Sequence, residues 1–127
     1  MENKNFKSSK KVAGFKFACN GIKVLLREES NALIHCIICA LVICVGFILK
    51  ISLTEWVAVV IVCGCVFAAE ALNTAIERLS DVVSPEYNEA IKKVKDLSAG
   101  AVLFMAITAA VSGIIIFSPK LISFLCE

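Results

Sequence analysis

The sequence contains none of the glycine-rich loops with which many proteins hold nucleotide phosphates. It has no G-x-x-x-x-G-K-[ST] motif and no glycine loop of the protein-kinase type. Charged residues are also scarce, because they make up 19% of the 127 residues and leave a net charge of only +2. Such a small excess of positive charge gives no general affinity for nucleic acid. Repeats, low-complexity tracts and linkers are lacking too, which leaves a single domain.

Charge is nearly absent from three long apolar segments, and hydrophobic residues make up 59% of the chain. Residues 32–49 are uncharged if His35 is neutral, residues 56–76 carry only Glu70, and residues 97–118 carry no charge. Each segment approaches the length of about 20 apolar residues that spans a bilayer. A soluble domain of this size would struggle to bury three such helices. The transmembrane helices that we expect are residues 32–50, residues 54–82 with a cytoplasmic extension, and residues 85–118.

The basic residues predict how these helices are oriented. Of the 13 lysines and arginines, eleven lie in the N-terminal arm or between the second and third apolar segments. Only Lys50 and Lys120 lie on the opposite side. Basic residues concentrate on the cytoplasmic side, so we expect a cytoplasmic N-terminus and an external C-terminus. The first apolar segment starts too late for a secretory signal and lacks an A-x-A-like cleavage site, so we expect it to remain in the mature chain.

Seven cysteines raise the possibility of a disulfide framework or a metal site. Six of them lie in apolar helical stretches, where cysteine behaves as a small hydrophobic residue. His35 and Cys36 with Cys39 resemble a ligand cluster, but no second pair stands at the spacing of a zinc site. We therefore interpret the cysteines as packing residues.

The N-terminal arm, at about residues 6–28, has apolar residues at helical intervals of three and four, with lysines between them. The apolar positions are Val12, Phe15, Cys19, Ile22, Leu25 and Leu26, and the lysines are Lys10, Lys11, Lys16 and Lys23. This pattern is typical of a helix that lies in the membrane interface with its lysines toward anionic headgroups. A solvated basic tail is the alternative, and the regular apolar spacing disfavours it.

Local signals predict where the spanning helices begin and end. Ser52 and Glu55 form a plausible capping box for the second span. The short connection before that span makes the first two spans an antiparallel hairpin. Ser84 can cap the third helix, with Pro85 as its first residue. Pro119 is expected to end that helix.

Polar residues form one stripe down the cytoplasmic half of the second span. At 100° per residue, Glu70, Asn73, Glu77 and Asp81 fall within about 80° of one another. Glu77 and Asp81 lie beyond the apolar run and could be an ordinary solvated helix end. Interhelical hydrogen bonding could explain Asn73, but it does not explain a glutamate at membrane depth. The other charged residues expected at this level are Glu28 and Glu29 at the end of the arm, and Lys92, Lys95 and Asp96 on the third span.

This set of residue types suits phosphoryl transfer. Carboxylate oxygens suit Mg²⁺, which typically takes one or two of them and fills its shell with waters and phosphate oxygens. A lysine can neutralise the phosphates, and a carboxylate deeper in the membrane could accept a proton from a lipid hydroxyl. Together these groups would make a phosphoryl transferase that acts on a membrane alcohol.

Two other functions fit parts of the pattern. A small proton-coupled exporter would also use one intramembrane glutamate, here Glu70, cycling between its protonated and ionised forms. Such a protein has less use for carboxylates and lysines at the cytoplasmic edge. An accessory membrane subunit, in which Glu70 pairs with a partner helix, would leave Glu29, Glu77 and Lys95 idle.

The stretch "EALNTAIERLSD" followed by "KVKDLSAGAVL" resembles the prokaryotic diacylglycerol kinase family, which includes undecaprenol kinases. The resemblance extends from about Lys10 to Pro119. It implies a homotrimer of three-span subunits in the bacterial cell membrane, with interfacial N-terminal helices and active sites built between neighbouring subunits. It also implies transfer of the γ-phosphate of MgATP to a lipid hydroxyl.

The resemblance assigns roles to individual residues by position. Glu70 matches the family's proposed general base and Asn73 its catalytic partner. Glu29 and Glu77 match the metal-coordinating glutamates, which also contact the nucleotide. Lys95 matches a catalytic lysine that contacts phosphate, and its neighbour Asp96 matches a residue of the nucleotide site. The further nucleotide contacts that the resemblance implies are Lys10, Phe17, Glu86, Tyr87 and Asn88. Ala99 matches a residue of the lipid site, together with Glu70. Phe17 replaces a tyrosine and Asn88 a histidine, which affects the adenine contacts but spares the metal and base positions.

The stretch "EESNALIH" bears on the lipid substrate. Asn31 and His35 resemble the undecaprenol kinase version of this stretch, whereas diacylglycerol kinases of Gram-negative bacteria tend to have a second acid at the histidine position. Ala32 departs from an expected aromatic residue. The resemblance therefore favours undecaprenol over diacylglycerol. His35 could equally be a structural residue that is hydrogen-bonded near the interface.

Overall fold

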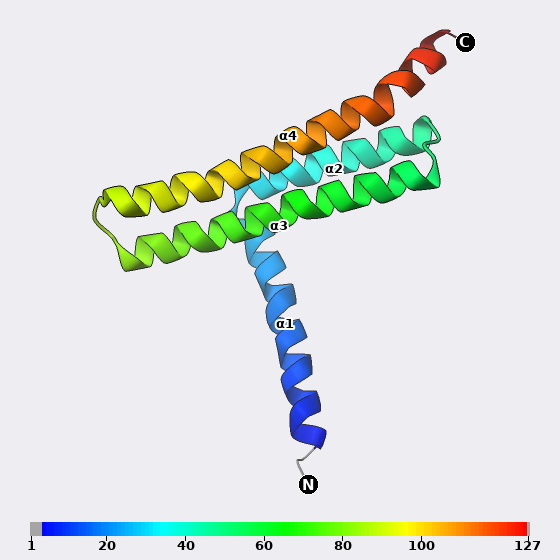
Figure 1. Ribbon diagram of the computed structural model, residues 1–127. Helices are drawn as coiled ribbons and strands as arrows, with labels where there is room; N and C mark the ends of the chain where they lie inside the picture. Colours follow the sequence, from blue (N-terminus) through cyan, green and yellow to red (C-terminus); the bar gives the residue numbers. More distant parts are fainter. Residues whose placement is uncertain (1–3, 127) are drawn as a thin grey trace.

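Four helices account for nearly all of the chain. The computed structural model describes the backbone of residues 4–126 and the side chains of residues 13–126. The helices are α1 (Lys4–Glu28), α2 (Ser30–Ile48), α3 (Leu53–Val83) and α4 (Glu89–Cys126). In Figure 1, α2, α3 and α4 lie side by side, and α1 leaves this bundle at a steep angle. The three bundle helices are each long and apolar enough to cross a membrane, which confirms the expected all-helical fold with three spanning helices.

The bundle has a small buried core and an apolar exterior. Within the described side chains, the buried apolar residues are Leu25, Ala32, Ile51, Val59 and Val66. Large side chains of α4 face outward instead, and Phe104, for example, is 71% exposed. A helix that is apolar all round belongs in a hydrophobic solvent or against partner helices. The exterior of the bundle therefore suits lipid better than water.

A tight hairpin joins α2 to α3 at one end of the bundle. Lys50 takes a left-handed backbone conformation with φ 50°. The capping box is present as expected: the Ser52 hydroxyl accepts from the Glu55 N–H at 3.3 Å, and the Glu55 carboxylate accepts from the Ser52 N–H at 2.6 Å. The pKa of Glu55, which lies outside the apolar run, is lowered chiefly by that backbone hydrogen bond. Lys120 contacts the Glu55 carboxylate at 3.1 Å and so joins α4 to this end of the bundle.

Gly46 brings α2 close to the start of α3. A Cβ atom at this position would lie 2.8 Å from Cη2 and 3.0 Å from Cζ2 of Trp56. The indole ring also packs on Phe47, with ring centroids 4.9 Å apart. The absence of a side chain at Gly46 is therefore what lets Trp56 lie against α2.

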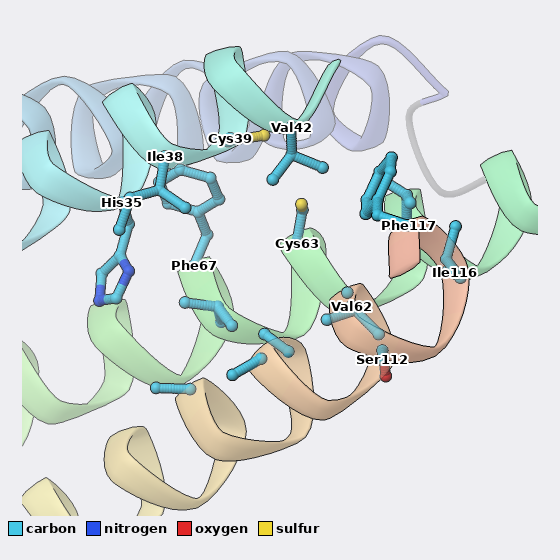
Figure 2. Close-up of a pocket in the computed structure, with 16 residues that line it drawn as sticks. His35, Ile38, Cys39, Val42, Val62, Cys63, Phe67, Ser112, Ile116 and Phe117 are labelled. Carbon is cyan, nitrogen blue, oxygen red and sulfur yellow. The ribbon is translucent and has the colours of Figure 1, made fainter. Parts of the chain in front are cut away.

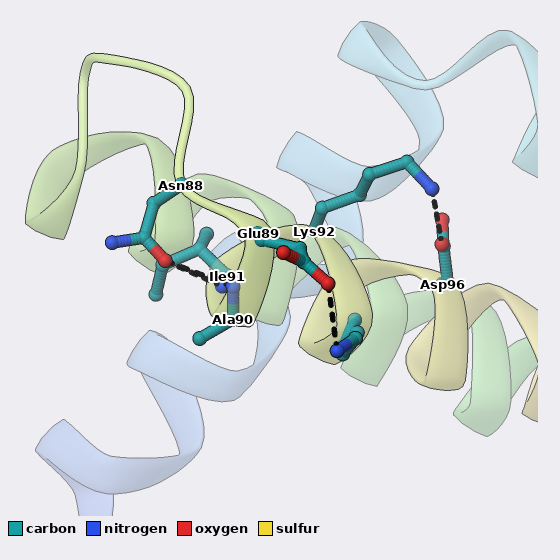
Figure 3. A network of polar contacts seen from close by, with 7 residues as sticks. Asn88, Glu89, Ala90, Ile91, Lys92 and Asp96 are labelled. Carbon is teal, nitrogen blue, oxygen red and sulfur yellow. Dashed lines mark hydrogen bonds and ion pairs between the residues drawn. The ribbon is translucent and has the colours of Figure 1, made fainter.

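The connection between α3 and α4 differs from the expectation. Helix α4 does not begin at Pro85 with Ser84 as its cap; α3 runs to Val83, and Ser84 is the residue that follows its end. Helix α4 begins at Glu89. The Asn88 side-chain oxygen accepts from the N–H groups of Ala90 at 2.9 Å and Ile91 at 3.2 Å (Figure 3). Asparagine caps a helix as well as serine does, and the prediction from Ser84 and Pro85 overlooked Asn88.

Pro119 does not end the third spanning helix. Helix α4 continues through this proline to Cys126. A proline inside a helix removes one backbone hydrogen bond. The loss of that one bond is not enough to end the helix here.

Helix α1 touches the bundle only near its C-terminal end. Leu25 is buried there, whereas Phe15 and Ile22 on the preceding turns are 74% and 60% exposed. Glu29 has an extended backbone (φ −113°, ψ 112°) and separates α1 from α2. Because α1 is steeply inclined to helices that can span a bilayer, its exposed apolar residues fit the expected position in the membrane interface (Figure 1).

Candidate active site

Buried polar side chains are concentrated on α3. Glu70 is 3% exposed and Asn73 is 7% exposed, and both lie on the stripe expected from the sequence. Thr74 and Ser80 are the other buried polar residues within the described part of the chain. Burying a charged or amide side chain is costly unless a partner is provided. Glu70 and Asn73 therefore each need a polar partner.

The contact of Glu70 crosses from α3 to α2. His35 Nε2 lies 3.5 Å from Glu70 Oε1, and the two side chains are 21% and 5% exposed respectively. The sequence drew attention to both residues but did not pair them. Counting residues from the hairpin places them about one helical turn apart, because His35 lies 13 residues before the end of α2 and Glu70 lies 17 residues after the start of α3. The count brings the two residues to neighbouring levels but does not pair them.

Asn73 has one satisfied and one unsatisfied group. Its Nδ2 donates to Glu77 Oε1 at 3.2 Å, so two members of the stripe are hydrogen-bonded one turn apart. Its Oδ1 is buried and has no hydrogen-bond partner among the residues whose side chains the structure describes. An unpaired buried acceptor costs about 1–3 kcal/mol, so this oxygen is suited to receive a donor or a cation from a ligand.

Arg78 links α3 to the junction between α1 and α2. Its guanidinium contacts Glu29 at 2.9 Å and Glu28 at 3.0 Å. The hydrogen bond to Glu29, followed by that to Glu28, raises the pKa of Arg78, which lies beyond the apolar run of α3. From the sequence, Arg78 is predicted only to be one of the cytoplasmic basic residues. The sequence signal for an ion pair was that Arg78 follows Glu77 at the level where Glu28 and Glu29 are also expected.

Lys95 joins α4 to the same end of α3. Its Nζ contacts Asp81 Oδ1 at 2.9 Å. This contact raises the pKa of Lys95, which precedes the apolar run of α4, and the negative charge of Glu77 adds to the effect. Asp96 instead contacts Lys92 at 3.0 Å along α4 itself (Figure 3). Lys95 is therefore the member of the α4 group that lies against the stripe.

Several residues that the resemblance assigns to the site do not join this cluster within one chain. The residues Phe17, Glu86, Tyr87, Asn88, Asp96 and Ala99 are exposed. Asn88 uses its side-chain oxygen as a helix cap. The side chain of Lys10 lies outside the described residues.

The carboxylate and amide oxygens of this cluster are few but of the kind that Mg²⁺ prefers. No group of three or more histidine, cysteine, aspartate or glutamate side chains is placed for a metal within the described chain. Mg²⁺ needs only one or two carboxylates when phosphates and waters complete its shell. The carboxylate of Glu77 and the unpaired oxygen of Asn73 lie on adjacent turns and fit this requirement. Glu29 is held by Arg78 through Oε1, which leaves its second oxygen for a ligand.

An apolar cavity of about 320 Å³ lies between α2, α3 and α4. Figure 2 shows His35 at one end of its lining and Ile116 and Phe117 at the other. The α4 part of the lining, residues 106–117, extends roughly 16 Å along the helix at 1.5 Å per residue. The cavity is thus elongated along the bundle, and its His35 end adjoins Glu70.

Comparison with known proteins identifies the family. Residues 16–117 match the family described as prokaryotic diacylglycerol kinase. The chain belongs to this family. A similar protein is undecaprenol kinase from Bacillus subtilis (strain 168), which is 38% identical over 120 residues, or 94% of this chain and 92% of the relative.

Two further members of the prokaryotic diacylglycerol kinase family are more distant. Diacylglycerol kinase from Synechocystis sp. is 34% identical over 114 residues, which cover 88% of this chain and 65% of the relative. Diacylglycerol kinase from Sinorhizobium sp. is 34% identical over 100 residues, which cover 78% of this chain and 72% of the relative.

Membership in the prokaryotic diacylglycerol kinase family decides between the expected functions. The protein is a membrane-embedded lipid kinase that uses ATP as its phosphate donor. The proton-coupled exporter is not favoured, since the family and the relatives are kinases.

Proposed function

We propose that this lipid kinase phosphorylates undecaprenol, using the Mg²⁺ complex of ATP. Support for the lipid comes from the relative named undecaprenol kinase, which matches 94% of the chain, and from Asn31 and His35. Diacylglycerol is the second candidate, because two relatives carry that name at 34% identity. The observation that carries the mechanism is the buried Glu70 beside the end of an elongated apolar cavity.

Glu70 is the proposed general base. Its carboxylate accepts the proton of the lipid hydroxyl as the hydroxyl oxygen bonds to the γ-phosphorus. The bond from that phosphorus to the bridging oxygen of ATP breaks, and ADP leaves. The proton on Glu70 then passes to solvent. A carboxylate at this depth meets a hydroxyl whose hydrocarbon chain cannot leave the bilayer without exposing apolar surface to water.

Glu77 and Glu29, with the unpaired oxygen of Asn73, are the proposed Mg²⁺ ligands. When bound, the metal would neutralise charge on the phosphates as the γ-phosphoryl group is transferred. Asn73 also orients its neighbours, because its amide already donates to Glu77 at 3.2 Å. Glu70, Asn73 and Glu77 of the α3 stripe thus run from lipid to nucleotide along one helix.

Lys95 and Arg78 supply positive charge around the phosphates. Both are paired with carboxylates in the structure, at 2.9 Å to Asp81 and Glu29 respectively, so both are held close to the stripe. A lysine binds phosphate as a point charge, whereas an arginine offers a planar fork of donors. The further proposed nucleotide contacts are Lys10, Phe17, Glu86, Tyr87, Asn88 and Asp96.

The lipid site is proposed to combine Glu70, Ala99 and the apolar cavity. The cavity lining is almost entirely hydrocarbon apart from His35, two thiols and one hydroxyl. Such a lining accepts an acyl or prenyl chain without breaking hydrogen bonds. Ala99 is exposed on α4, one turn after Lys95, and its small side chain leaves space for a headgroup.

The proposed assembly is a homotrimer in the bacterial cell membrane, with active sites shared between subunits. Exposed assigned residues such as Phe17 and Tyr87, at 73% and 82%, support sharing, since one chain does not gather them into the cluster. The proposed orientation places the N-terminus and the active site in the cytoplasm and the C-terminus outside. The distribution of basic residues supports it.

A single assay tests the proposed substrate. Purified protein in mixed micelles would receive γ-labelled ATP, Mg²⁺ and either undecaprenol or diacylglycerol at matched mole fractions. We expect label in the undecaprenol fraction at a higher kcat/KM than in the diacylglycerol fraction. Preferential labelling of diacylglycerol would overturn the choice of lipid, and labelling of neither would overturn both candidates.

A further inference from the structure

His35 is the residue through which α2 reaches the buried carboxylate of α3. The contact from Nε2 to Oε1 of Glu70 is 3.5 Å, and Glu70 is 3% exposed. No other ion pair of Glu70 occurs among the residues whose side chains the structure describes. Among the described side chains, His35 is therefore the charged or titratable neighbour that can fix which carboxylate oxygen of Glu70 faces a substrate.

The surroundings of His35 offer it few competing partners. On the cavity side the other titratable groups are two thiols, Cys39 on its own helix and Cys63 on α3. Helix α4 contributes alanines, glycine, large apolar residues and Ser112 to the lining, and none of these carries a charge (Figure 2). The imidazole therefore lies between an apolar cavity and a single carboxylate.

Neutral histidine can fix a carboxylate without adding a second charge. One ring nitrogen carries a proton and donates, while the other accepts. With the proton on Nε2, a modest shortening of the 3.5 Å separation lets His35 donate to Oε1 of Glu70 and leaves Oε2 for the substrate. Contacts of this kind are often long in the absence of substrate and tighten when the reacting groups are assembled.

We propose that His35 is a positioning residue that holds the Glu70 carboxylate so that its second oxygen faces the lipid hydroxyl at the end of the cavity. This inference rests on the proposed role of Glu70 as the general base. We expect His35 to affect turnover but not the binding of the nucleotide. Its side chain contacts Glu70 and the cavity, whereas Glu77 and Lys95 have other partners.

Two amide variants test this geometry. His35→Gln places a donor at nearly the reach of Nε2, whereas His35→Asn is one methylene shorter and cannot reach Glu70. We expect His35→Gln to retain kcat within about threefold and His35→Asn to lose about tenfold or more, with the KM for MgATP unchanged in both, since a misaligned base removes transition-state stabilisation only. Cys36→Ala, which alters the adjacent α2 residue outside the cavity lining, is the control and should behave as the parent protein.

The dependence on Glu70 is tested by a double-mutant cycle. In a Glu70→Gln background, His35→Asn should cause no further loss, because the group that it positions is already gone. Equal loss from His35→Gln and His35→Asn, or the same loss with and without Glu70, would overturn the positioning role. So would full activity of His35→Asn beside an inactive Glu70→Gln, a result that leaves the base assignment intact. Full activity of Glu70→Gln itself would remove the base assignment and the inference together.

Discussion

Asn73 shows how a single residue can be both structural and poised for a ligand. Its Nδ2 donates to Glu77, while its Oδ1 is buried without a partner. In a protein that only folds, a side chain of this size would be apolar or fully paired, because a half-satisfied buried amide is worse than an apolar group. The arrangement fits the proposed role of Asn73 in binding MgATP.

The role of Glu77 in holding the metal is tested by Glu77→Gln. The glutamine side chain has nearly the same size and keeps one oxygen, but it has no negative charge to hold the metal. We expect turnover to fall by about 10² or more, because the metal then no longer neutralises charge on the transferring phosphate. Activity should be measured across a Mg²⁺ titration, with Glu89→Gln as the matched control. Glu89 is exposed and pairs with Lys93 on α4, away from the stripe. Activity of Glu77→Gln close to that of the control would remove Glu77 from the site.

The sequence predicted which residues are unusual better than it predicted how they pair. Glu70 and Asn73 were recognisable, because a charge and an amide interrupt an apolar run at helical spacing. The pairs His35–Glu70 and Arg78–Glu29 connect different helices, and such pairs depend on how far one helix is shifted along another. The pattern of apolar and polar residues along a single helix contains no information about that shift.

At the scale of the elements, the α2–α3 hairpin is what fixes His35 opposite Glu70. Its turn combines Lys50 at φ 50° with the capping box of Ser52 and Glu55. The close approach of Trp56 to Gly46 locks the two helices near the turn. Any change that tilts α2 away from α3 at this end is carried along both helices toward the site.

Gly46→Ala tests this packing. The new Cβ would meet the Trp56 ring at 2.8 Å, so the ring or a helix must move, and we expect a loss of about 1–3 kcal/mol in stability. Gly21→Ala is the matched control, because nothing lies within 4 Å of a Cβ there. The measurement is the midpoint of thermal unfolding in detergent. Unchanged midpoints for both variants would show that the contact between Gly46 and Trp56 does not constrain the hairpin.

Sequence signals predicted some helix ends correctly and others wrongly. The capping box at Ser52 was found because two residues act at a fixed spacing. The predicted start of α4 at Pro85 is wrong, because Asn88 and not Ser84 caps the helix, and both residue types are good caps. Pro119 was expected to end α4, but the helix continues through it, because a proline removes only one backbone hydrogen bond.

At the scale of the whole molecule, the bundle and α1 together indicate how the protein meets the membrane. The number of spans was predictable from the three apolar runs in the sequence, because so small a core cannot bury three such helices. The charged contacts of Arg78 and Lys95 gather at the end of the bundle where α3 meets α4, and Lys120 contacts Glu55 at the other end. The first end is the one expected in the cytoplasm.

Orientation is tested by labelling intact cells with a membrane-impermeant thiol reagent. Lys4→Cys and Lys120→Cys would be made in a background with Cys19 and Cys126 replaced by serine, since both are exposed. We expect label on residue 120 only, and label on both after the cells are opened. Label on residue 4 alone in intact cells would reverse the orientation.

The central claim, that Glu70 is the base that meets a lipid hydroxyl inside the membrane, is tested most directly by Glu70→Gln. The measurement is lipid phosphorylation at saturating substrates, with thermal stability in detergent determined on the same sample. The account predicts turnover lowered by about 10² or more with the fold and nucleotide binding retained, the usual effect of removing a positioned general base. A glutamate with only a structural role would give the opposite result, because neutralising a buried charge relieves its desolvation. Retained turnover together with raised stability would contradict the account.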